Sequence, residues 1–424
     1  METILLKNVR AVDGNKDTVC DIFISDGIIK DMGENLGISA DRVIDGKGLL
    51  AAIPALFDMH VHFRDPGQTH KEDILTGCGA ALAGGISGVA CMPNTTPPID
   101  NPETVRYILE KAERTGVEVF PVGCITRGLS GGELYDHTKI GVRIISDDGR
   151  PVKNAELMRQ ALEQTRENGI LAASHCEDLD IINGGIINKG EISEKLGVKG
   201  MDRASEDSIT AREIALADSC GARIHICHVS TKGSAEIIRD AKKRGIKVTC
   251  ETCPHYFTYT EEKLLSRDAD YRMNPPLRTE ADRIAILEAV LDGTVDCIVT
   301  DHAPHAESEK SDFLTAPNGV VGLETSLAVT LTQLYHTGKI SLNRIVELMA
   351  VNPRRLLGLA EPVLEKGARA DIAIVDLDRE WTVVPEELHS KSKNTVFKGE
   401  KLKGKNVMTI TSGIIRYDIL KNLF

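Results

Sequence analysis

The sequence lacks any apolar run long and uncharged enough to span a bilayer. Its first residues, METILLKNVRAVDG, also lack the basic and apolar regions of a signal peptide. We therefore expect a cytoplasmic protein that does not associate with membranes. The 424 residues are 42% hydrophobic and 27% charged, as in ordinary globular chains. That length suffices for one large barrel-type domain and a smaller second domain.

Positive charge is scarce. The formal net charge is -12, which argues against a nucleic-acid surface, because such surfaces carry basic stripes. An anionic substrate would therefore need a local positive field, supplied by a metal ion or an arginine. The sequence also shows no repeat of short period, so a solenoid is not expected.

A second CxxC pair is missing as well. Cys250 and Cys253, in VTCETCPHY, form the one CxxC of the chain, and a structural zinc site would need another pair. A redox motif is the alternative, but we favour a buried strand that ends at Pro254. Most of the ten cysteines lie in apolar stretches, which indicates reduced, buried thiols.

Short β-rich runs alternate with helical runs from residue 54 onward, which predicts a parallel (β/α)8 barrel of TIM type over residues 54–362. Helical stretches between the runs end at Gly116, Gly169 or Gly293, the usual helix-stop residue. Two further helices, GLETSLAVTLTQLYHTG and SLNRIVELMAVNPRRLLGL, complete this region. The eight expected strands lie in ALFDMHVHF, GISGVACMPN, VEVFPVGCIT, GVRIISDD, GILAASHCED, ARIHICHVS, IKVTCETCPH and VDCIVTDHAPH.

The two ends of the chain differ from this pattern. Residues 1–53 and 363–424 contain short strand-like runs, and the first of these segments has Asp-Gly and Lys-Gly turns. We expect them to pair into one small β-sandwich domain built from both termini. The fold class is therefore α/β, with a barrel and a β-rich terminal domain.

Imidazole and carboxylate side chains gather where the predicted strands end. His60 and His62 follow the apolar run LLAAIPALFDM and point to one face of a strand, because the side-chain period is two. An HxH pair alone is weak, but the carboxyl ends of barrel strands meet at one face, and zinc accepts these ligand types. Six ligands suit two bridged ions. The candidates are His60, His62, either Asp147 or Asp148, His175, His228 and Asp301.

Neighbouring strand residues face opposite ways, so one of Asp147 and Asp148 is a ligand and the other caps the loop DDGRPVKN. By the same reasoning His225, three positions before His228, should face out of the barrel. The remaining histidines that fall in loops or at helix ends are assigned no role: His70, His137, His336 and His389.

Several motifs together resemble the dihydroorotases of the bacterial biosynthetic type, within the amidohydrolase superfamily. These are FDMHVHFRDPG, CMPNT, SDDG, HCED, HVST, MNPPLR and TDHAPH. The segments HFRDPG and MPNT are quite specific to dihydroorotases, whereas HxH and the strand-eight aspartate are shared by the superfamily. The likeness runs along nearly the whole chain and includes KGARADIAIVDLD near its end.

The resemblance implies two zinc ions per subunit, or one, as in some aspartate-type relatives. His60, His62 and Asp301 would hold one ion and His175 and His228 the other, with Asp148 as the bridge. Many relatives use a carboxylated lysine there, but GVRIISDDG offers no lysine. The implied substrate contacts are Arg64, Asn94 and His305 to the carboxylate, Asn274, Asn318 and Gly319 to the pyrimidine ring, and His62.

The implied activity is the reversible closure of N-carbamoyl-L-aspartate to dihydroorotate, with zinc-activated hydroxide and Asp301 as general acid and base. A homodimer and an aspartate transcarbamoylase partner are further expectations by resemblance. The alternatives are a hydantoinase or allantoinase, or a metal-free structural subunit. Arg64 argues against the cyclic-amidase alternatives, since it would grip a ring carboxylate if the strand geometry persists to it. The competing interpretation pairs Arg64 with Asp65 or Glu72 at the surface.

Overall fold

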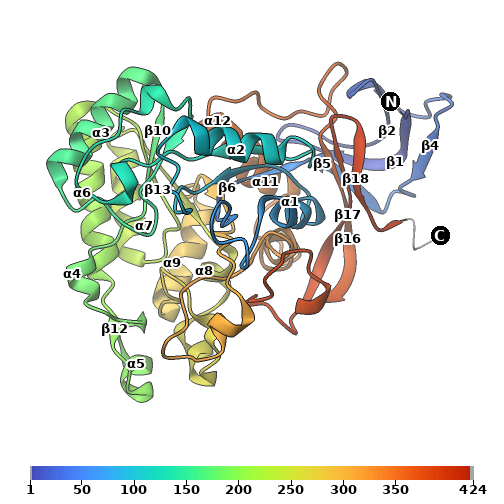
Figure 1. Cartoon of the computed structure of the whole chain (residues 1–424). Helices are drawn as coiled ribbons and strands as arrows, with labels where there is room; N and C mark the ends of the chain where they lie inside the picture. The colour runs from blue at the N-terminus through green and yellow to red at the C-terminus, as the bar shows by residue number, and fades with distance from the viewer. Residues whose placement is uncertain (1, 421–424) are drawn as a thin grey trace.

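Strands from both ends of the chain pair in one sheet at one side of the molecule (Figure 1). The structure is a computed structural model that describes residues 2–420. Within that range the sheet has eight strands in the order β18-β17-β16-β5-β1-β2-β3, with β4 beside β1. The strands are β1 (Ile4–Val12), β2 (Asp17–Ser25), β3 (Ile28–Gly33), β4 (Arg42–Asp45), β5 (Leu50–Pro54), β16 (Ile372–Thr382), β17 (Lys401–Thr411) and β18 (Ile414–Asp418).

Antiparallel pairing of β5 with β16 joins the two ends, with Ile53 opposite Ala373. The sheet has its own hydrophobic cluster, in which Ile4 of β1 lies opposite Ile24 of β2. Alternating apolar residues in these strands fill that cluster, as expected for strands with one buried face. The terminal segments therefore fold together around a shared core.

Eight parallel strands form the rest of the framework, one in each of the runs expected from the sequence. They lie in two sheets, β6-β7-β8 and β9-β10-β13-β14-β15. Isolated parallel bridges link the sheets at both edges, Gly123 with Ile145 and Val61 with His302. The strands are β6 (Leu56–Val61), β7 (Ile86–Cys91), β8 (Glu118–Pro121), β9 (Ile144–Ile145), β10 (Leu171–Ser174), β13 (Ile224–Ile226), β14 (Val248–Thr252) and β15 (Cys297–Ile298).

Helices follow most of these strands. Gly169 ends α3 in a left-handed conformation, as predicted, but α2 and α9 end before Gly116 and Gly293. The helices are α1 (Ile74–Ala83), α2 (Pro102–Ala112), α3 (Ala155–Asn168), α4 (Leu179–Ile182), α5 (Glu191–Leu196), α6 (Ala204–Cys220), α7 (Lys232–Lys243), α8 (Pro254–Thr258), α9 (Glu280–Leu291), α10 (Ser326–Thr330), α11 (Leu342–Val346) and α12 (Asn352–Leu356).

Two π-helical segments, η6 (Leu331–Tyr335) and η7 (Glu347–Val351), continue α10 and α11. Short 3₁₀ turns occur at η1 (Arg127–Leu129), η2 (His137–Lys139), η3 (Glu261–Ser266), η4 (Ala269–Tyr271), η5 (Glu307–Lys310) and η8 (Pro385–Glu387). A small excursion after β10 carries α5 and the parallel pair β11 (Ile187–Asn188) and β12 (Gly200–Met201) away from the main body (Figure 1).

The parallel strands are shorter than the predicted runs, and several functional candidates lie beyond their ends. β6 ends at Val61, before Arg64, whose φ is +60°. His228 and Asp301, which follow β13 and β15, have φ values of +31° and +48°. Positive φ is uncommon for residues other than glycine. The backbone turns at these positions, so the period of two no longer decides where the side chains point.

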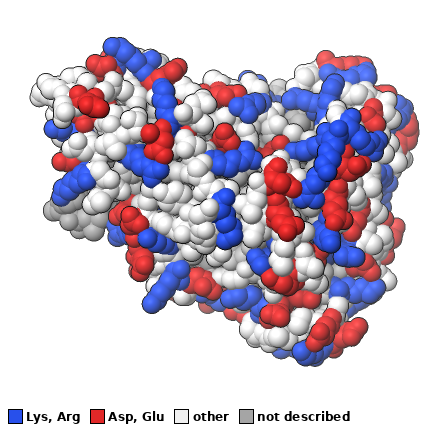
Figure 2. All heavy atoms as spheres, turned by 180° about the vertical axis from the view of Figure 1, so that it is seen from behind, with Lys and Arg blue, Asp and Glu red and all other residues white. Residues whose placement is uncertain are grey.

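The surface carries both signs of charge. On the face shown in Figure 2, lysine and arginine side chains alternate with aspartate and glutamate. Within residues 2–420, every helix is too short or too polar to cross a bilayer.

Candidate metal and substrate site

The carboxylate of Asp148 lies among four imidazoles that come from three different strand ends. Its Oδ1 is 3.4 Å from Nε2 of His60, 3.5 Å from Nδ1 of His175 and 3.6 Å from Nε2 of His228. Its Oδ2 is 3.4 Å from Nε2 of His62. Burial acts to raise the pKa of Asp148, but the charge of His60 and the nearby imidazoles of His175 and His228 hold that pKa well below its usual range.

Asp301 completes one side of this cluster. Its Oδ1 lies 3.1 Å from Nε2 of His62 and 3.6 Å from Nε2 of His60. On the other side, Nδ1 of His175 and Nε2 of His228 face each other at 2.8 Å. The six predicted ligands thus lie in two subsets, His60, His62 and Asp301 on one side and His175 and His228 on the other, with Asp148 between them.

The far nitrogen of three imidazoles faces an oxygen that fixes the ring. Nδ1 of His60 is 2.6 Å from Oε1 of Glu251, and Nδ1 of His62 is 2.7 Å from Oδ1 of Asn94. Nε2 of His175 is 3.2 Å from Oε2 of Glu177. In a neutral ring, an N–H that donates its hydrogen bond to this carboxylate or amide oxygen leaves the lone pair of the opposite nitrogen facing the cluster, as in metal-ligating histidines.

These groups fit a metal ion. Two triads have ligand atoms within 4.8 Å of one another, His60 with His62 and Asp148, and His175 with His228 and Asp148. Nε2 of His60 and Oδ1 of Asp148 are buried and make no hydrogen bond within residues 2–420. Buried polar atoms of that kind are rare unless an ion or water satisfies them. A third triad includes Cys227, but burial raises the pKa of its thiol, which disfavours the thiolate form that binds metals.

Asp147 takes the structural role, although on a different loop from the one predicted. Its carboxylate accepts hydrogen bonds from the backbone N–H groups of Ile125 (2.8 Å) and Thr126 (3.1 Å) and from the Thr126 hydroxyl. Burial raises the pKa of Asp147 to about 6, against the effect of these hydrogen bonds. It therefore fixes the segment after β8, while Asp148 faces the histidines.

The expectation that His225 faces outward is wrong. Its Nε2 lies 3.1 Å from Oε2 of Glu251, the same carboxylate that holds His60, and its Nδ1 is 2.8 Å from Oγ1 of Thr249. The parity argument fails because β13 ends at Ile226 and the backbone turns at His228. His225 therefore supports the position of His60 through Glu251.

Arg64 is buried, with 8% of its surface exposed, and lies beside His305. Its Nε donates to the Pro304 carbonyl (3.3 Å), and Nη2 is 3.5 Å from Nε2 of His305. The two acids of the competing interpretation are engaged elsewhere. Asp65 accepts from Tyr107 and Lys111, and Glu72 from Ser390, Thr76 and the Lys391 N–H.

The remaining substrate candidates lie on three loops. Asn274 donates through Nδ2 to Oε1 of Glu177 (2.9 Å), the same glutamate that contacts His175. Nε2 of His305 lies 2.9 Å from the Asn318 carbonyl, and Nη2 of Arg272 donates to Oδ1 of Asn318 (3.3 Å). The backbone of Asn318 and Gly319 thus joins His305, whereas the Asn318 side chain is held by Arg272.

Sequence reasoning missed the groups that orient the ligands, above all Glu251 and Glu177. A charged residue inside an otherwise uncharged strand is the sequence signal that could have found Glu251. It lies in β14 (VTCET), and only 1% of its surface is exposed. The histidines assigned no role lie elsewhere: His137 and His336 contact the carbonyls of Ile125 and Leu377, and His70 and His389 pair with Glu309 and Glu324.

Comparison with known proteins agrees with this geometry. The profile of the family described as Dihydro-orotase-like matches residues 49–234. A dihydroorotase from Geobacter sp. (strain M21) is 47% identical over 425 residues, which cover 98% of this chain and 99% of that protein. A dihydroorotase from Acetivibrio thermocellus is 45% identical over 426 residues, with 98% and 100% covered.

Solved structures show the same fold. An L-hydantoinase (dihydropyrimidinase) from Arthrobacter aurescens superposes with a TM-score of 0.86 at 26% identity and covers 99% of this chain and 96% of its own. A dihydropyrimidinase from Brevibacillus agri NCHU1002 gives 0.86 at 22% identity, with 98% and 95% covered.

Fold and site together define the chain as a cyclic amidohydrolase. Within that class, identity over nearly the full length decides the assignment, and the chain belongs to the dihydroorotase family.

The ligand geometry predicts that the purified protein carries a divalent transition metal. His175→Ala or His228→Ala should lower the content by up to about one ion per chain, because each removes a ligand from the same subset. His336→Ala, which changes a ring bound to the Leu377 carbonyl, is the control and should leave the metal unchanged. Elemental analysis gives the content. Full activity after exhaustive chelation would contradict the prediction.

The two adjacent aspartates should behave differently. Asp148→Ala should lose metal, whereas Asp147→Ala should keep it and lose about 1–3 kcal/mol of unfolding free energy, because the Ile125 and Thr126 donors lose their acceptor. Elemental analysis and urea unfolding measure the two effects. Metal loss in the Asp147 variant alone would reverse the assignment.

Proposed function

We propose that the protein is a dihydroorotase that interconverts N-carbamoyl-L-aspartate and (S)-dihydroorotate in de novo pyrimidine (UMP) biosynthesis. The observation that carries this proposal is the Asp148 cluster with the buried pair Arg64 and His305 nearby. The cluster suits hydrolysis of an amide, and a guanidinium suits a substrate carboxylate. The family supports the same reaction, since near full-length relatives are named dihydroorotase.

The proposed cofactor is zinc, with two ions per subunit or one. His60, His62 and Asp301 would hold the first ion and His175 and His228 the second, with Asp148 shared, because it alone belongs to both triads. When bound, zinc supplies a Lewis acid that polarises the carbonyl and lowers the pKa of the attacking water to about 7.

Asp301 is the proposed general base and general acid. In ring opening, a water oxygen adds to the amide carbonyl carbon, and Asp301 accepts the proton that the water loses. The same carboxylic acid then gives the proton to the ring nitrogen as the C–N bond breaks. Contact with His62 and proximity to His60 lower the pKa of Asp301, against its burial, so the carboxylate starts in the basic form.

The proposed substrate contacts extend from this centre. Arg64 and His305 would bind the carboxylate together with Asn94, whose Oδ1 is already held by His62 and whose amide group is left for the substrate. Asn274, Asn318 and Gly319 would contact the pyrimidine ring, and His62 would lie against it. For His305, a substrate contact would compete with the Asn318 carbonyl.

We also propose that the two edge bridges close a complete (β/α)8 barrel. Residues 54–362 would form that barrel domain, and residues 1–53 and 363–424 the β-sandwich domain. A homodimer, association with an aspartate transcarbamoylase and a cytoplasmic location belong to the same proposal and rest on the family.

Loss of the proton carrier should abolish turnover in both directions. Asp301→Asn should lower the rates of ring opening and closure by about 10²–10⁴-fold, the usual contribution of general acid–base catalysis. Both rates are read from the absorbance of dihydroorotate. Asn keeps the size of the side chain, so part of the metal should remain. Near-normal turnover would show that another group moves the proton.

Arg64→Met tests the carboxylate contact. A hydrogen bond to a charged group contributes about 1.5–3 kcal/mol, so the loss should be roughly 10- to 150-fold in kcat/KM for dihydroorotate. Arg64→Lys should recover only part of it, since an ammonium lacks the paired donors. Metal content should not change. Arg159→Met, which removes an exposed arginine paired with Glu156, is the matched control.

Dihydrouracil, which has the ring but no carboxylate, distinguishes a substrate-binding role of Arg64 from a structural role. Its slow hydrolysis should be nearly equal in the wild type and in Arg64→Met. Equal losses on both substrates would make Arg64 structural and would favour a hydantoinase-type substrate.

A further inference from the structure

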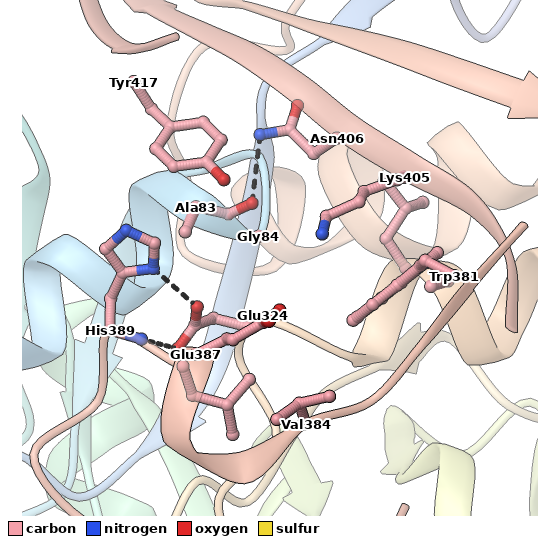
Figure 3. A pocket seen from close by; sticks show the side chains of 13 residues that line it. Ala83, Gly84, Glu324, Trp381, Val384, Glu387, His389, Lys405, Asn406 and Tyr417 are labelled. Atoms are coloured by element: carbon pink, nitrogen blue, oxygen red, sulfur yellow. Dashed lines mark hydrogen bonds and ion pairs between the residues drawn. The ribbon is translucent and has the colours of Figure 1, made fainter. Parts of the chain in front are cut away.

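The segment Leu388–Asn394, here called the strap, lies between β16 and β17 and leaves the terminal sheet. Its first anchor is Glu324, just before α10. Oε1 of Glu324 accepts from the N–H groups of His389 (2.7 Å) and Ser390 (3.1 Å), and Oε2 lies 2.8 Å from Nδ1 of His389. Figure 3 shows His389 and Glu324 facing each other beside a small cavity.

That cavity measures about 60 Å³, far below the 300 Å³ or more of a typical ligand site. Lys405 lies over the Trp381 ring in its wall, at 4.3 Å from the ring centroid. We therefore regard the Glu324 contact as an anchor for the strap.

A second set of contacts ties the strap to the loop that follows Arg64. The Ser390 hydroxyl and the Lys391 N–H donate to the Glu72 carboxylate, which is fully buried. Nζ of Lys391 donates to the Thr69 carbonyl (2.6 Å), and the Ser392 hydroxyl donates to the Lys71 carbonyl (2.6 Å). The contacts with Glu324 and with the loop after Arg64 thus fix the strap before it reaches His305 and Gly319.

Asn394, at the end of the strap, joins two separate substrate segments through one amide. Its Oδ1 accepts from the backbone N–H of His305 (3.2 Å), and its Nδ2 donates to the carbonyl of Gly319 (2.9 Å). Its own carbonyl accepts from the Val321 N–H (3.1 Å). The side chain is buried, with 4% of its surface exposed.

The segments that Asn394 joins are closely packed. Gly319 has a φ of +144°, and a Cβ there would lie 2.6 Å from the Ala303 carbonyl oxygen and 3.0 Å from Cδ2 of His305. Since only glycine fits, the backbone at Gly319 lies directly against Ala303 and the His305 ring. Nζ of Lys310 also donates to the Gly319 carbonyl (3.1 Å), so that oxygen keeps a donor if Asn394 is changed.

We propose that Asn394 is a positioning residue that sets the distance between His305 and Gly319, and with it the fit of the substrate carboxylate and ring. It acts through these two residues without touching the substrate. The inference rests on the proposed function, which makes His305 and Gly319 substrate contacts. It also means that the C-terminal part of the chain, which supplies β16, β17 and β18 of the terminal sheet, contributes to substrate selectivity.

Asn394→Ala tests the proposal. It leaves the buried His305 N–H without its acceptor, so KM for dihydroorotate should rise about 5- to 100-fold. Metal content should stay constant. The value of kcat should change by no more than about threefold, because the lost contact weakens binding of the ground state and of the transition state equally. Preference for dihydroorotate over dihydrouracil should fall, since His305 belongs to the carboxylate contacts.

Asn394→Asp has nearly the same shape and serves equally if the alanine variant does not fold. It keeps an acceptor for the His305 N–H but replaces the donor to Gly319 by an oxygen, so KM should again rise. The matched control is Asn343→Ala, because Nδ2 of Asn343 donates to the carbonyls of Asp13 (2.7 Å) and Lys16 (2.8 Å). That variant should lose stability with KM unchanged.

An unchanged KM in folded Asn394→Ala or Asn394→Asp would overturn the proposal. A fall in kcat and metal content at constant KM would overturn it too, because that pattern marks a general structural defect. Failure of the proposed function has a different signature, namely wild-type protein that does not convert dihydroorotate at all.

Discussion

The rest of the site depends on one interaction, the contact of the buried Asp148 carboxylate with four imidazoles. Taking a carboxylate out of water costs several kcal/mol unless charge and hydrogen bonds compensate it. Here both oxygens face imidazole nitrogens at 3.4–3.6 Å, and one imidazole pair meets at 2.8 Å. A cation at the centre would compensate the buried carboxylate and bind the imidazole nitrogens, so we regard the strand ends as a preformed candidate metal site.

The rings of this site are held by further residues on neighbouring strands and loops. Glu251 of β14 holds His60 and is itself held by His225, and Asn94 holds His62. Groups of this kind fix the tautomer and direction of a ligating ring. Glu177 contacts both His175 and Asn274, so a candidate metal ligand and a candidate ring contact share one carboxylate. The candidate substrate and metal sites are therefore linked through the Glu177 carboxylate.

With the proposed substrate contacts, selectivity within this fold lies in the loops. Hydantoinase-type structures superpose over nearly the whole chain, so the framework alone does not distinguish ring substrates. What differs chemically is the carboxylate of dihydroorotate, and the groups suited to it, Arg64 and His305, lie beyond the strand ends. The strap brings the C-terminal segment to the same loops, which explains why a residue as distant in sequence as Asn394 belongs to the substrate region.

The sequence by itself determined which strands exist, because apolar runs with punctuating glycines mark them, and which residue types end them. It also predicted that the histidines and aspartates at these strand ends lie together, since the carboxyl ends of parallel strands meet. The period of two left Asp147 and Asp148 open, and the family resemblance named Asp148. The tertiary structure places Asp148 among the imidazoles and turns His225 inward. At His228, Asp301 and Arg64 the backbone has positive φ, so side-chain direction no longer follows the period of two. Partners such as Glu251 and Asn394 are far away along the chain, and only packing brings them to His60 and His305.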